Sequence, residues 1–194
     1  TNNKHDNKTE FLSILFWGIY FDVITKRADL NALVEFIESS SFENIMNGIK
    51  VAIIDSESPS QLFKKFTNEF KIPGLSYAYF TKLFFFYREA SDKPTYPILD
   101  KWLSNAWCAL DGSINKNSEV YNKYFKGRTN PIFDGILKRN KDTAYEEYVR
   151  FMDETAKKEN TTISNLEEKL FGAHIGKYQK NNPRTLYREW ALKN

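Results

Sequence analysis

The 194-residue sequence contains little cysteine and little histidine. Cys108 is the single cysteine, so the chain cannot form an intramolecular disulfide. The two histidines leave a Cys/His metal cluster without enough ligands. These scarcities exclude a secreted disulfide scaffold and a structural zinc protein, and we expect neither a metal nor another cofactor.

The sequence also lacks a strong charge of one sign and a long apolar run. It has 28 Lys and Arg against 25 Asp and Glu, so any contact with nucleic acid must come from local clusters of charge. The apolar stretch from Phe11 to Val23 is shorter than the roughly 20 residues that span a bilayer. Charged residues follow it, rather than a small-residue cleavage site. We therefore expect a buried helix, no membrane partner and a cytoplasmic protein.

Alternation of apolar and polar residues is scarce, and Val51 to Ile54 is the one short β-branched run. Apolar residues instead recur at helical spacing, which predicts an all-α protein. We expect a flexible tail over residues 1–9 and a single two-lobed helical domain over residues 10–194. Ser164 and Glu167 have the spacing of a capping box. The predicted helices are 10–25, 29–39, 42–54, 60–70, 75–87, 98–110, 118–125, 143–159, 164–171 and 184–192.

The densest pattern lies between residues 71 and 106. A helix ending at Phe70 is followed by a tight Ile-Pro-Gly-Leu-Ser turn and then by a helix that is apolar on every side and must therefore be central. The arrangement predicts a helix-hairpin-helix. Amides near Gly74, Leu75 and Ser76 would lack intrahelical acceptors, and together with the helix dipole they suit a phosphate group.

Three short motifs in this region resemble the helix-hairpin-helix DNA glycosylase superfamily, specifically the bacterial proteins similar to 8-oxoguanine DNA glycosylase. They are Pro73-Gly74-Leu75-Ser76, Thr81-Lys82-Leu83 and Pro97-Ile98-Leu99-Asp100, with a weaker match in the helices near 145–156 and 166–171. The likeness covers about half of the chain. Many members have a glycine where this chain has Ser76, and a lysine where it has Ala78.

The resemblance implies an active site between two helical lobes. Asp100 stands where the family has its aspartate, and Lys82, one helical turn beyond Ala78, would be the nucleophile in members that also cut the strand. The implied activity is base excision repair: a DNA glycosylase that removes an oxidised purine such as 8-oxoguanine, with the lyase step left open. A lysine buried among phenylalanines suits nucleophilic attack, because desolvation disfavours its charged form.

Further residues are candidates for contact with DNA. A flipped base needs stacking walls, and Trp17 and Trp102 are candidates for them. Basic side chains recur every four residues near the C-terminus, which would form one phosphate-binding stripe if that segment is helical. The predicted DNA-binding residues are Gly74, Ser76, Lys180, Arg184 and Arg188.

Each of these residues has a simpler structural interpretation. Asp100 also fits an ordinary helix N-terminus, Lys82 a side chain that extends to the surface, and the two tryptophans a hydrophobic core. The basic stripe also fits a solvated helix face. The alternative function is a catalytically inactive DNA-binding or phage-defence protein on the same fold, and a further one is an all-α interaction protein. A shared cleft for Lys82 and Asp100 would favour the enzyme.

Overall fold

The structure of the protein is a computed structural model. It describes residues 6–16, 30–70, 72–110, 119–125, 136, 140–171, 182, 183 and 186. These residues form helices and turns and include no β-strand, which confirms the predicted all-α class. The chain divides into two compact units, Thr1–Pro94 and Thr95–Asn194, each of which is described by itself. The single domain over residues 10–194 stays a prediction.

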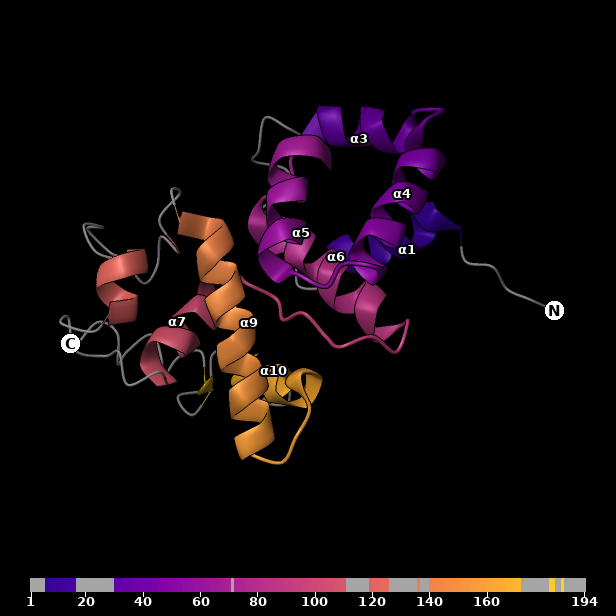
Figure 1. Ribbon diagram of the computed structural model, residues 1–194. Coiled ribbons are helices and arrows are strands. Elements are labelled where there is room, and N and C mark those ends of the chain that lie inside the picture. Colours follow the sequence, from indigo (N-terminus) through magenta and orange to yellow (C-terminus); the bar gives the residue numbers. More distant parts are fainter. Residues whose placement is uncertain are drawn as a thin grey trace. The chain divides into compact units, whose positions relative to one another are not determined.

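The first unit contains five α-helices and a π-helical segment among its described residues (Figure 1). Its α4 has the predicted bounds, and α3 differs from the prediction by one residue at each end. The predicted helix 60–70 is divided, because its last turn widens into a π-helix. The elements are α1 (Asn7–Phe16), α3 (Leu30–Glu38), α4 (Phe42–Ile54), α5 (Pro59–Lys65), η1 (Phe66–Phe70) and α6 (Tyr77–Glu89).

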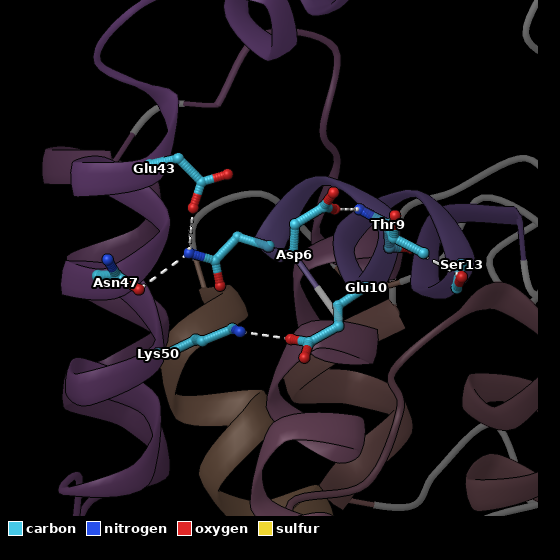
Figure 2. Close-up of polar contacts among 8 residues, drawn as sticks. Asp6, Thr9, Glu10, Ser13, Glu43, Asn47 and Lys50 are labelled. Atoms are coloured by element: carbon cyan, nitrogen blue, oxygen red, sulfur yellow. Dashed lines mark hydrogen bonds and ion pairs between the residues drawn. The ribbon is translucent and has the colours of Figure 1, made fainter. Parts of the chain in front are cut away.

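Helix α1 begins earlier than predicted, so residues 7–9 are helical and not part of a tail. The reason is an N-cap: the side chain of Asp6 accepts the N–H of Thr9 at 2.6 Å. The amide of Asn7, which is 8% exposed, donates to Glu43 at 2.6 Å and to Asn47 at 2.9 Å on α4. Figure 2 shows this end of α1 against α4, where Lys50 also pairs with Glu10.

Helix α6 is the centre of the first unit, as its apolar sequence predicted. It packs against α1 and α4, and residues on all its faces are buried. The rings of Phe63 and Phe80 lie 4.9 Å apart, and those of Phe66 and Phe84 lie 4.7 Å apart. These ring pairs hold α5 and η1 against α6, and thus fix the two arms on either side of the turn at residues 72–76.

The end of α4 is capped by a side chain from α6. Arg88, which is 4% exposed, donates from Nη1 to the carbonyls of Ile53 and Ser56, each at 2.8 Å. Its Nε donates to the carbonyl of Pro94 at 2.6 Å. A buried guanidinium therefore satisfies carbonyls that the helix end leaves without intrahelical donors.

The described helical elements of the second unit are α7 (Lys101–Leu110), η2 (Tyr121–Phe125), α9 (Lys141–Lys158) and α10 (Ile163–Phe171), with α10 folded back against α9 (Figure 1). Helix α10 also packs against α7. The ring of Trp107, which is 1% exposed, lies 5.6 Å from that of Tyr124 and 5.4 Å from that of Tyr148. The next residue, Cys108, is also buried, as expected for a small apolar side chain.

The predicted capping box at Ser164 and Glu167 is wrong. Helix α10 begins at Ile163, and the hydroxyl of Thr162 accepts the N–H of Asn165 at 3.1 Å. Thr162 is therefore the N-cap. Glu167 is 5% exposed and turns to the interior, where it accepts a different backbone N–H. The predicted helix 184–192 lies outside the described residues apart from Leu186.

Candidate active site

The turn before α6 has a geometry that its sequence explains. The N–H of Leu75 donates to the carbonyl of Ile72 at 3.2 Å, and Gly74 has a φ of 72°. A type II β-turn, in which Pro is common at the second position, requires such a positive φ at its third, which glycine adopts most readily. The amide of Leu75 is therefore used within the turn. Among the described residues, the amides of Gly74 and Ser76 donate to no acceptor, and the Ser76 side chain does not cap α6.

Lys82 is buried, with 6% of the residue exposed. Its Nζ lies 5.2 Å from the centre of the Tyr79 ring, three residues back along α6. A helical side chain leans toward the N-terminus of its helix, so the amine lies over the first turn of α6. The predicted alternative, in which Lys82 extends to the surface, does not fit this burial. The candidate amine and the amides of the preceding turn thus belong to the same end of one helix.

Asp100 is the N-cap of α7. Its Oδ1 accepts the N–H of Trp102 at 2.8 Å and that of Leu103 at 2.9 Å, which fixes the direction of the carboxylate. The helix-terminus role that the sequence allowed is therefore real. It does not exclude a chemical role, because an ionised carboxylate offers about four lone-pair sites on its two oxygens.

The segment before Asp100 is held by α9 and α10 of the same unit. Tyr145 of α9 donates its hydroxyl to the carbonyl of Pro97 at 3.0 Å. Glu167 of α10 accepts the N–H of Ile98. Ile98 is 1% and Leu99 0% exposed. Asp100 thus follows a buried backbone segment whose position α9 and α10 determine.

Tyr148 lies among these groups. It is fully buried, and its hydroxyl has no hydrogen-bond partner among the described residues. Burial raises the pKa of this phenol well above its usual value, and the nearby charges of Glu167 and Asp100 raise it further. A buried phenol therefore lies near two carboxylates, the buried one of Glu167 and the half-buried one of Asp100.

The predicted site residues lie in both units, and some lie outside the described part of the chain. Lys82 belongs to the first unit and Asp100 to the second, so their shared cleft stays a prediction. Trp102 is half-buried in the first turn of α7, and the core tryptophan of this helix is Trp107. The predicted residues that lie outside the described part of the chain are Trp17, Lys180, Arg184 and Arg188.

The roles of Tyr145 and Glu167, which hold the segment before Asp100, were not predicted from the sequence. Glu167 stands between Leu166 and Leu170 on the buried side of α10, and a carboxylate on an apolar face was the signal. Tyr145 has the spacing of a core residue with Tyr148 and Met152, so nothing in the sequence marked its hydroxyl.

Of the described residues, no three His, Cys, Asp or Glu side chains gather where they could hold a metal ion. No helix among them is long and apolar enough to cross a membrane.

The fold and these residues define an all-α protein with a buried lysine in its central helix and a capping aspartate at the start of a second-unit helix. The comparison with protein families agrees with the resemblance seen in the sequence. The chain belongs to the family described as "Putative 8-oxoguanine DNA glycosylase OGG-like protein", which it matches over residues 3–171. No curated protein and no solved structure matched the chain.

Proposed function

We propose that the protein is a DNA glycosylase that excises an oxidised purine, 8-oxoguanine above all, from DNA in the cytoplasm. The observation that carries the proposal is the burial of Lys82 in the central helix of a chain that belongs to this family. Lysine is seldom fully buried in proteins, because burial disfavours the charged form of its amine. In a pocket that excludes water, its amine is suited to attack at a sugar carbon.

The chemistry divides between the two candidate residues. The neutral amine of Lys82 attacks C1′ of the lesion nucleotide, the bond from C1′ to the base breaks, and the base leaves with a proton. The carboxylate of Asp100 accepts the proton of the attacking amine, or stabilises the positive charge that develops on the sugar. The first product is an amine adduct at C1′, and the leaving base takes up the proton that the amine gave to Asp100. The C1′–O4′ bond then breaks and the remaining amine proton goes to O4′, which gives a covalent imine between protein and sugar. Later β-elimination from this imine would cut the strand.

The other candidates serve DNA binding. The amides of Gly74 and Ser76 would bind a backbone phosphate at the N-terminus of α6. Lys180, Arg184 and Arg188 would contact further phosphates, and Trp17 and Trp102 would stack on the extruded base. The position of the amine over the first turn of α6 supports this arrangement, because the proposed nucleophile and the proposed phosphate anchor then belong to the same end of one helix.

A borohydride-trapping assay tests the proposal. The protein is incubated with a duplex that holds a single 8-oxoguanine opposite cytosine, and base release and covalent adducts are both measured. We expect release of 8-oxoguanine and a trapped adduct. Release without trapping would identify a glycosylase that uses water rather than Lys82. Binding of the duplex with neither product would refute the proposal and favour a DNA-binding protein.

Matched variants assign the two roles. Lys82→Gln should abolish trapping, whereas Lys158→Gln, on an exposed position of α9, should not. Asparagine caps a helix about as well as aspartate, so Asp100→Asn should keep the fold and slow excision about 100-fold or more. Asp100→Ala should slow it equally and also lower the thermal midpoint. An Asp100→Asn protein with the wild-type excision rate would remove Asp100 from the mechanism.

A further inference from the structure

The second unit contains a carboxylate that the proposed reaction does not use. Glu167 is 5% exposed and accepts the N–H of Ile98, which lies 69 positions earlier in the chain. A buried carboxylate is costly unless hydrogen bonds or opposite charges compensate it. Thr162 already caps α10, so Glu167 is not needed for that purpose.

The hydrogen bond of Glu167 acts on the backbone immediately before Asp100. Ile98 is two residues from Asp100. The carbonyl of Pro97, which belongs to the same peptide group as the N–H of Ile98, accepts the hydroxyl of Tyr145 at 3.0 Å. This one peptide group is thus held at both of its polar atoms, its carbonyl oxygen from α9 and its N–H from α10.

The Asp100 carboxylate depends on this backbone for its direction. Its Oδ1 is held by the amides of Trp102 and Leu103 at 2.8 and 2.9 Å, which fixes it relative to α7. The contacts of Tyr145 and Glu167 fix the backbone two residues before it relative to α9 and α10. A carboxylate that caps one helix and follows a backbone segment held by two others has little freedom to move when a substrate binds.

We propose that Glu167 is the positioning residue for Asp100: its carboxylate holds the Ile98 amide and thereby sets where the Asp100 carboxylate lies. The inference rests on the proposed function for its catalytic consequence, but the positioning itself is a property of the folded protein. Because the required group is a hydrogen-bond acceptor, an amide oxygen can replace the carboxylate, whereas a hydrocarbon cannot.

Glu167→Leu, Glu167→Gln and the control Glu154→Leu, at an exposed position of α9, test the inference. Amide hydrogen exchange at Ile98, Trp102 and Leu103 is followed by NMR, with single-turnover excision and DNA affinity measured in parallel. In Glu167→Leu we expect faster exchange at all three amides. Excision should be slower by about 10- to 100-fold with unchanged DNA affinity, because a small misplacement of a catalytic group costs that much. Glu167→Gln should restore both properties, and Glu154→Leu should change neither.

The outcomes separate this inference from the proposed function. If the wild-type protein releases no base, the proposed function fails, and the exchange data still decide the positioning role. Exchange in Glu167→Leu no faster than in Glu154→Leu would overturn it. If Glu167→Leu does not fold, Glu167→Met decides, because it removes the hydrogen-bond acceptor and keeps an unbranched side chain of similar length. Unchanged exchange at Ile98, Trp102 and Leu103 in that variant would overturn the inference equally.

Discussion

Replacement of Arg88 by methionine should strongly destabilise the first unit. The substitution keeps most of the hydrocarbon stem and removes the guanidinium, which is buried with 4% of the residue exposed. Four carbonyls lose a charged donor: those of Ile53 and Ser56 at 2.8 Å, that of Pro94 at 2.6 Å and, at the longer distance of 3.4 Å, that of Ile54. A hydrogen bond to a charged group contributes about 1.5 to 3 kcal/mol.

The lower end of that range applies, because Ser56 and Pro94 lie near solvent and water can replace part of their lost bonds. The expected loss is then about 4 kcal/mol, a large share of the roughly 5 to 15 kcal/mol by which a domain is stable. With an m value of about 2 kcal/mol/M, the urea midpoint should fall by about 2 M.

Urea unfolding and peptide-resolved hydrogen exchange measure this effect. Exchange should accelerate at the end of α4 and over residues 90–96, where the guanidinium contacts the backbone. Arg150→Met, at an exposed position of α9, is the control and should leave the midpoint close to that of the wild type. A midpoint shift below about 0.3 M in Arg88→Met would correspond to less than one neutral hydrogen bond and would refute the capping role.

Two further predictions concern stability. Gly48 lies inside α4 with nothing within 4 Å of an added Cβ, so Gly48→Ala should stabilise the protein by about 0.5 to 1 kcal/mol, whereas Gly74→Ala, at a φ of 72°, should cost about 1 to 2 kcal/mol. Equal effects of the two substitutions in urea unfolding would contradict the turn geometry. Because burial raises the pKa of Tyr148 above its usual value of 10.0, the unfolded chain loses this proton first as the pH rises. The free energy of unfolding should therefore be constant with respect to this group below pH 10 and fall above it. Tyr148→Phe should remove that part of the alkaline decline and, since the hydroxyl has no partner among the described residues, raise stability at neutral pH by about 1 kcal/mol. Parallel pH profiles for Tyr148→Phe and the wild type would contradict this.

The helical class and most helix positions follow from local sequence. The bounds of α4 came directly from its apolar spacing, and the central place of α6 came from the absence of a polar face. Where a predicted helix start was wrong, the cause is an N-capping side chain, which the spacing of apolar residues does not reveal. Capping by Asp6 starts α1 at Asn7 rather than at the predicted residue 10. Capping by Thr162 starts α10 at Ile163, one residue before the predicted start at Ser164.

The candidate site divides in the same way. The sequence by itself determined that an amine stands within the most apolar helix and that an aspartate begins a later helix, because both facts depend on residue type and local order. Only the tertiary structure decided what surrounds them. Lys82 is buried because other helices cover α6. The hydrogen bonds of Tyr145 and Glu167 to the segment before Asp100 join residues far apart in the chain. Such contacts arise from how helices pack, and no periodicity within one helix encodes which backbone group a distant carboxylate will meet.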